Sequence, residues 1–137
     1  MKNRFVLDAW AVLALLKGEQ PAAWRVAQVL GQAGTGEAEA YLSIINLGEV
    51  FYRIGRLKGE EEAAATLEGI RLLAVTTVPA SEDLVFAAAT LKMHHAISYA
   101  DAFALASAER LSATVLTGDP ELVQLGDQFQ IERLARK

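Results

Sequence analysis

The chain has 137 residues, 53% of them apolar and 22% charged, with a net charge of −4 and no cysteine. This is the length of one ordinary domain, and we expect residues 1–137 to form a single domain. The lack of cysteine excludes disulfide scaffolds, thiolate zinc sites and cysteine nucleophiles. The acidic balance argues against nucleic-acid binding by bulk charge, but it does not exclude a nuclease whose metal ions neutralise its own carboxylates.

The apolar runs are too short to cross a bilayer, and no export signal opens the chain. We therefore expect a soluble, cytoplasmic protein that does not enter a membrane. Along the chain, short β-branched or apolar runs alternate with longer helical patterns. Strands are predicted at 4–7, 40–45, 74–78, 113–117 and 130–134, and helices at 9–16, 21–34, 46–57, 60–73, 81–94 and 98–111. This alternation predicts an α/β fold with three α/β/α layers and a central parallel sheet of about four to five strands.

Two aspartates directly follow predicted strands. Asp8 comes after the first strand, and Asp119 comes after the strand at 113–117. Each is well placed to cap the helix that it precedes, because aspartate accepts hydrogen bonds from free backbone N–H groups. Sites in open parallel sheets form beyond the carboxyl ends of the strands. If the two strands are neighbours, the two carboxylates therefore converge.

A third aspartate, Asp101, lies in the alanine-rich stretch "AISYADAFALASA". Ser98, three residues earlier, makes a capping role for this region plausible. On a helical wheel, however, Asp101 falls among Ala104, Leu105 and Ala108, which is the apolar side. A carboxylate is costly to bury there unless it is paired or bound to metal, so we favour a functional role.

The helix predicted at 46–57 has two stripes. Its apolar stripe, which we expect in the core, comprises Leu47, Val50, Phe51 and Ile54. Its polar stripe comprises Asn46, Glu49, Arg53 and Arg56. One interpretation is a solvated face with a Glu49–Arg53 pair, and the other is one wall of a cleft.

Each of these signals is weak alone, but together they place four acids at one predicted edge of the sheet. Clustered carboxylates repel one another, and such a cluster persists by binding protons or cations. Oxygen donors without cysteine or histidine suit Mg²⁺ or Mn²⁺ rather than zinc. The sequence contains no Walker loop and no HExxH motif, and the residue two after Asp8 is Trp10, which argues against a DxD phosphatase.

Four motifs in order, "FVLDAWAVLALL", "SIINLGEV", "SYADAFALASA" and "VLTGDPEL", resemble the PIN-domain family, most closely its small VapC-type toxins of toxin–antitoxin pairs. The resemblance implies an Mg²⁺- or Mn²⁺-dependent ribonuclease. It implies that the metal ligands are Asp8, Glu49, Asp101 and Asp119, supported by Thr117 and Asn46. Many relatives carry serine or threonine after the first aspartate. This chain has Ala9 and Trp10 there, so a hydroxyl that supports the site is missing.

Our hypothesis is metal-assisted hydrolysis of RNA phosphodiester bonds at these acids. Arg53, Arg56 and Lys58 are candidates for RNA contact, although a solvated basic face explains them equally well. The alternatives are a catalytically inactive module that binds RNA or a partner, and a related nuclease acting on DNA. The resemblance also implies an antitoxin partner and a homodimer. An apolar groove for the antitoxin would use Trp10, Trp24 and Phe51, which otherwise belong to the core.

Overall fold

The computed structural model describes residues 2–136, and these form a five-stranded parallel sheet in the order β3-β2-β1-β4-β5. The strands are β1 (Asn3–Leu7), β2 (Ala38–Ser43), β3 (Thr76–Val78), β4 (Thr114–Thr117) and β5 (Ile131–Arg133). The chain builds outward from β1 to β3, then crosses back to β4 on the other side of β1. The strand order thus switches between β1 and β4, which is where open parallel sheets form their sites.

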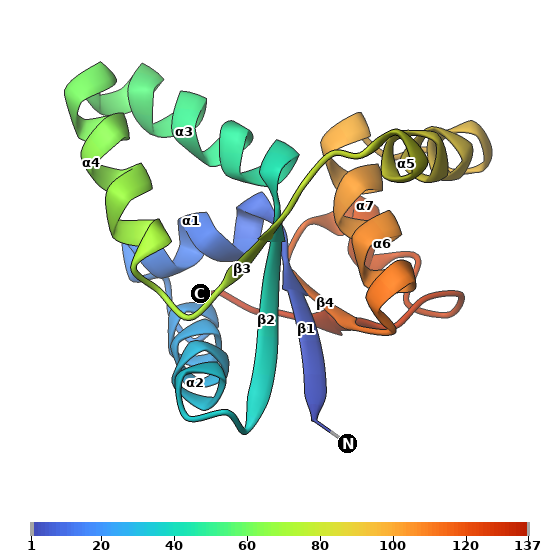
Figure 1. Cartoon of the computed structure of the whole chain (residues 1–137), viewed down its shortest axis with the longest axis horizontal. Coiled ribbons are helices and arrows are strands. Elements are labelled where there is room, and N and C mark those ends of the chain that lie inside the picture. Colours follow the sequence, from blue (N-terminus) through green and yellow to red (C-terminus); the bar gives the residue numbers. More distant parts are fainter. Residues whose placement is uncertain (1, 137) are drawn as a thin grey trace.

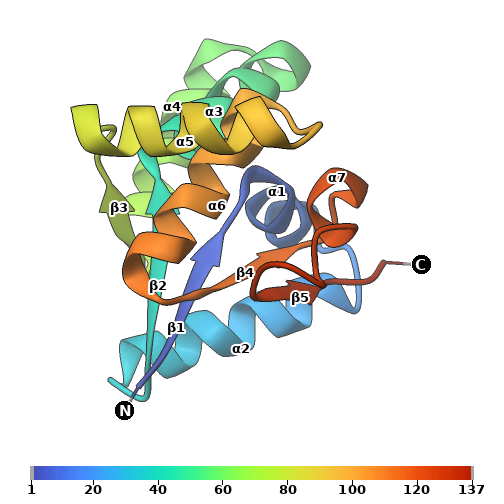
Figure 2. The ribbon, with the colours of Figure 1, turned by 90° about the vertical axis from the view of Figure 1, so that its right-hand side faces the viewer.

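Helices cover both faces of the sheet (Figure 1). They are α1 (Ala9–Lys17), α2 (Ala22–Gly34), α3 (Ile44–Lys58), α4 (Glu60–Arg71), α5 (Glu82–His94), α6 (Tyr99–Leu111) and α7 (Pro120–Val123). Helices α1 to α4 lie on one side of the sheet and α5 to α7 on the other (Figures 1 and 2). The predicted three-layer α/β/α architecture is confirmed.

The alternation of side chains along β1 produces two cores. Phe5 and Leu7 pack into the core beneath α1 to α4, while Val6 points to the opposite face, into the core formed with α5 to α7. Buried alanines of α6 allow that helix to pack closely on β1, β2 and β4. Both faces of the central strands are therefore dry, as a parallel sheet requires.

Several element boundaries differ from the prediction. The second strand ends at Ser43, not Ile45, because the Ser43 hydroxyl accepts a hydrogen bond from the Ile45 N–H at 3.1 Å and starts α3 there. The third strand is shorter than predicted and begins at Thr76. Helix α7 follows Asp119 and Pro120, as that pair of residues indicates.

The predicted stripes of α3 are wrong at two positions. Asn46, assigned to the polar stripe, is fully buried, and Phe51, assigned to the core, has 38% of its surface exposed. The reason is that α3 packs on α6 as well as on α1 and α4, so its buried face is shifted toward Asn46. Among the helices of residues 2–136, none has the length and apolar character needed to cross a membrane.

Candidate functional site

The two aspartates at strand ends both cap helices, and they are joined by one hydroxyl. Asp8 Oδ1 accepts the Ala11 N–H at 2.8 Å, at the start of α1, and its other oxygen accepts the hydroxyl of Thr117. The same hydroxyl oxygen accepts the Asp119 N–H at 2.9 Å. Because β1 and β4 are neighbours, Thr117 at the end of β4 links the Asp8 carboxylate to the backbone of Asp119. The predicted capping is confirmed for both, because Asp119 Oδ1 accepts the Glu121 N–H at 3.0 Å at the start of α7. The two strands are neighbours, as the predicted convergence requires.

The Asp101 carboxylate lies on the buried side of α6, and only 6% of the residue is exposed. The cap of α6 is Ser98, whose hydroxyl accepts the Asp101 N–H at 3.1 Å, so the carboxylate itself is not used for capping. One oxygen each of Asp101, Asp119 and Glu121 lie within 4.8 Å of one another. Within the described part of the chain, Asp101 Oδ2 is buried without a hydrogen-bond partner.

Glu121 was missed in the sequence, where it is one of several acids in first turns of helices. Its carboxylate accepts the Ser98 N–H at 3.2 Å, which connects the start of α7 to the start of α6. The available signal was its spacing: in "GDPEL", Glu121 follows Asp119 by two residues at the beginning of a helix. A short helix that starts at Pro120 directs both acids toward the same sheet edge.

Glu49 and Arg53 face the aspartates from α3. They form an ion pair, with Arg53 Nη2 2.9 Å from Glu49 Oε2, and both line the cleft. Both interpretations of this stripe therefore hold in part: the ion pair of the solvated face is present, and the two residues also line the cleft. Asn46 donates to the Ala100 carbonyl at 3.1 Å and so ties α3 to the first turn of α6, next to Asp101.

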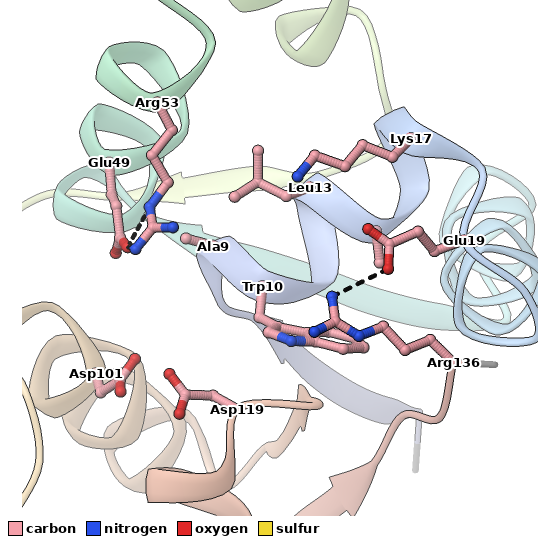
Figure 3. Close-up of a pocket in the computed structure, with 11 residues that line it drawn as sticks. Ala9, Trp10, Leu13, Lys17, Glu19, Glu49, Arg53, Asp101, Asp119 and Arg136 are labelled. Atoms are coloured by element: carbon pink, nitrogen blue, oxygen red, sulfur yellow. Dashed lines mark hydrogen bonds and ion pairs between the residues drawn. The ribbon is translucent and has the colours of Figure 1, made fainter. Parts of the chain in front are cut away.

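A cleft of about 200 Å³ lies between the Glu49–Arg53 pair and the carboxylates of Asp101 and Asp119 (Figure 3). It is lined by Ala9, Trp10, Leu13, Ala14, Lys17, Glu19, Glu49, Arg53, Asp101, Asp119 and Arg136. In the described chain, the other predicted RNA contacts lie outside this cleft: Arg56 packs over the Tyr52 ring at 5.1 Å, and Lys58 is exposed at the end of α3.

The environment of the aspartates disfavours their charged forms. Burial raises the pKa of Asp8 from an ordinary 3.8 to about 7, and the charges of Asp119 and Glu49 add to the rise. The hydrogen bonds from Thr117 and Ala11 oppose the rise in the Asp8 pKa without cancelling it. Burial also raises the pKa of Asp101 well above its usual range, and contact with Asp119 and Glu121 raises it further.

A divalent cation fits this donor set. The acids at the cluster supply hard oxygen donors, which Mg²⁺ and Mn²⁺ prefer, and the free oxygen of Asp101 lacks any other partner in the described residues. A cation there would also relieve the mutual repulsion that raises the pKa of Asp101. Asp101, Asp119 and Glu121 are positioned to hold it directly. Glu49, which is hydrogen-bonded to Arg53, lines the cleft, whereas Asp8, which is hydrogen-bonded to Thr117, is buried and does not line it in the described structure.

Together, the fold and the site define an α/β/α domain with an acidic cluster at the carboxyl edge of its sheet. A model of the PIN domain matches residues 5–128. The chain therefore belongs to the PIN-domain family. A comparison with curated protein sequences finds no significant match.

Solved structures of toxin–antitoxin systems share this fold. A toxin–antitoxin complex from Klebsiella pneumoniae matches with a TM-score of 0.71 at 14% identity, covering 96% of this chain and 98% of that chain. VapBC2 from Rickettsia felis, bound to a DNA fragment from its promoter, matches with a TM-score of 0.72 at 16% identity, covering 96% and 99%. VapC20 from Mycobacterium tuberculosis, a toxin that cleaves the sarcin–ricin loop, matches with a TM-score of 0.70 at 18% identity, covering 91% and 95%. At these identities the likeness concerns the fold.

Proposed function

We propose that the protein is a VapC-like toxin: an endoribonuclease that depends on Mg²⁺ or Mn²⁺ and hydrolyses RNA phosphodiester bonds. The observation that carries the proposal is the cluster of Asp101, Asp119 and Glu121 oxygens within 4.8 Å, at the switch point of the sheet. An acidic cleft repels a polyanion, and a bound cation reverses the local sign of the charge. The same cleft thereby becomes a site for a phosphate group.

The residues of the chain have distinct roles in this proposal. Asp101, Asp119 and Glu121 hold the ion, with Asp8 and Glu49 completing the site. When bound, the ion supplies Lewis-acid chemistry: it lowers the pKa of water and offsets the charge on the leaving oxygen. Thr117 fixes the orientation of the Asp8 carboxylate through its hydroxyl, and the Asn46 amide holds α3 against the turn that carries Asp101.

The choice of RNA as the substrate rests on the family and on its structural neighbours, one of which cleaves an RNA loop. Arg53 at the cleft is placed to contact RNA phosphates. Arg56 and Lys58, further along α3, would extend that contact beyond the cleft. The proposal also includes the cytoplasmic location expected from the sequence, because RNA is found there.

An antitoxin partner is supported by the neighbours, which are toxin–antitoxin complexes, and by a groove between α1 and α3. The groove is lined by Leu13, Lys17, Tyr52, Arg53, Arg56 and Leu57, and it has three lining residues in common with the cleft. Its apolar walls and basic rim suit an amphipathic acidic segment of a partner. Of the residues that we assigned to such a groove, none lines it in the described structure: Trp10 lines the cleft instead, and Trp24 and Phe51 lie outside both. The homodimer stays a prediction, tested by analytical ultracentrifugation.

The experiment compares an RNA and a DNA oligonucleotide of the same sequence, each with Mn²⁺ and with EDTA. Cleavage of the RNA alone, and only with Mn²⁺, is the expected result. Cleavage of the DNA would contradict the proposed ribonuclease and support the alternative, a nuclease that acts on DNA. Binding of RNA without cleavage under any condition would contradict an enzyme and support the inactive binding module.

A further inference from the structure

The cleft has a second end, opposite the acids, that the proposed chemistry does not use. It is built from Trp10 and Lys17 of α1, Glu19 just beyond α1, and Arg136 near the end of the chain (Figure 3). Figure 3 shows the Arg136 guanidinium beside the Trp10 indole, with Asp119 on the far side of that indole. One continuous cleft thus runs from an acidic end to an end that carries cations and an aromatic ring.

Trp10 has a fixed place between these ends. Its indole packs so closely on Gly118 that a Cβ at that position would lie 2.3 Å from the ring. Gly118 stands between Thr117 and Asp119, so the indole rests directly on the loop that carries a proposed metal ligand. The position of Trp10 is therefore coupled to the position of Asp119.

Arg136 is held on this ring. Its guanidinium carbon lies 5.4 Å from the centroid of Trp10, and Nη1 lies 3.1 Å from Glu19 Oε2. The stacking is a cation–π contact, which suits the planar guanidinium better than it suits lysine. Despite these contacts the side chain is 56% exposed, so its remaining N–H donors face solvent in the cleft.

Backbone hydrogen bonds hold residues 134–136 in place without help from the Arg136 side chain. Leu134 N–H donates to the Thr117 carbonyl at 2.7 Å, and Ala22 N–H donates to the Ala135 carbonyl at 2.9 Å. The segment is therefore already tied to β4 and to the start of α2. The guanidinium is not needed to hold the chain end, and a preorganised, half-exposed arginine in an acidic cleft has the features of a phosphate ligand.

We propose that Arg136 is a substrate-binding residue: it binds a phosphate of the RNA that flanks the scissile one, with Trp10 and Glu19 holding its guanidinium in place. This inference rests on the proposed ribonuclease function. RNA that lies along the cleft would have its scissile phosphate at the acids and a neighbouring phosphate at Arg136. The arginine thus sets affinity and register, while the acids carry the chemistry.

The test is steady-state cleavage of a short single-stranded RNA with Mn²⁺ by wild type, Arg136→Ala and Arg136→Lys. Arg133→Ala is the matched control, because Arg133 is an exposed arginine of β5 outside the cleft. For Arg136→Ala we expect KM to rise about 10-fold, because a charge-assisted hydrogen bond to the substrate is lost. The kcat of this variant should stay within about twofold of the wild-type value. Its plot of log KM against log salt should lose about 0.7 of slope, the value of one phosphate contact on a single strand.

The KM of Arg136→Lys should lie between those of wild type and Arg136→Ala, because lysine keeps the positive charge but cannot stack its planar group on the Trp10 ring. Mn²⁺ affinity by calorimetry and the melting temperature should match wild type in each variant, as should the KM of Arg133→Ala. An unchanged KM and salt slope in Arg136→Ala would overturn the inference while the ribonuclease stands. Equal losses in Arg133→Ala, or a fall in Mn²⁺ affinity, would also overturn it. Failure of wild type to cleave or bind RNA would refute the proposed function, and this inference with it.

Discussion

Asp8 and Asp101 are buried carboxylates whose burial disfavours their charged forms. Burial raises the pKa of Asp8 to about 7. Burial also raises the pKa of Asp101, and contact with Asp119 and Glu121 adds to that rise. In the absence of metal, the folded protein therefore keeps protons that the unfolded chain releases near pH 4. Stability of the metal-free protein should fall as pH rises from about 4, through the Asp8 pKa of about 7, to the Asp101 pKa of about 9, because over this range the folded state binds more protons than the unfolded chain.

The Asp101→Asn variant isolates this effect. In EDTA at about pH 8 it should unfold at a higher temperature than wild type, by the equivalent of roughly 1–3 kcal/mol, because a neutral amide folds without the proton uptake that the raised Asp101 pKa requires of wild type. The difference should shrink at about pH 5.5, because the proton that wild type takes up at Asp101 on folding costs less free energy at lower pH. Differential scanning calorimetry at the two pH values measures it. If Asp101→Asn is less stable than wild type in EDTA at pH 8, burial of Asp101 does not destabilise the metal-free protein, and the prediction is wrong.

Thr117 is the residue that links the two aspartates at strand ends. Its hydroxyl donates to Asp8 and accepts from the Asp119 N–H. Thr117→Val keeps the shape and removes both hydrogen bonds, so it should weaken Mn²⁺ binding by about 10–100-fold, as losses of supporting hydrogen bonds do. Thr117→Ser keeps the hydroxyl and serves as the control. Calorimetric titration with Mn²⁺ measures both, and equal affinity in Thr117→Val and wild type would refute the role.

At the scale of the elements, the loop after β4 is packed against α1. Gly118→Ala places a methyl group where the Trp10 ring lies, so it should destabilise the protein by about 1–3 kcal/mol and displace the indole. Gly31 is the matched control, because it lies within α2 with open space around its Cα. Gly31→Ala should stabilise the protein by up to about 1 kcal/mol through helix propensity. Urea unfolding measures both, and a neutral Gly118→Ala would show that the loop is free to move.

The elements were predicted well where one local rule decides them. The aspartates after β1 and β4 follow from strand ends in a parallel sheet, and the burial of Asp101 follows from its place on the wheel of α6. The prediction that Asn46 lies on the polar stripe of α3 was wrong, because a helical wheel does not show which other helices pack against α3. Helix α6 determines that face, and its position depends on the whole fold.

At the scale of the whole molecule, the site depends on contacts that link distant parts of the chain. Arg136 has no local pattern that distinguishes it from other surface charges, and the local signal for Glu121 is limited to its spacing from Asp119. Glu121 joins the site because α7 follows β4 directly. Arg136 reaches Trp10 because β5 pairs with β4 and carries the chain end past α2. Both residues reach the site because of the order of the strands in the sheet, which no single segment of the sequence encodes.

In the proposed function, the acids at the switch point bind a divalent ion that is required to cleave RNA. The most direct test is the initial rate of RNA cleavage against Mn²⁺ concentration for wild type and Asp101→Asn, with Mn²⁺ affinity and melting temperature measured on the same samples. We predict saturable, EDTA-sensitive cleavage by wild type. We predict a loss of at least about 100-fold in rate for Asp101→Asn, with weaker Mn²⁺ binding and an intact fold. Cleavage by Asp101→Asn at the wild-type rate, or cleavage by wild type that persists in EDTA, would contradict the account.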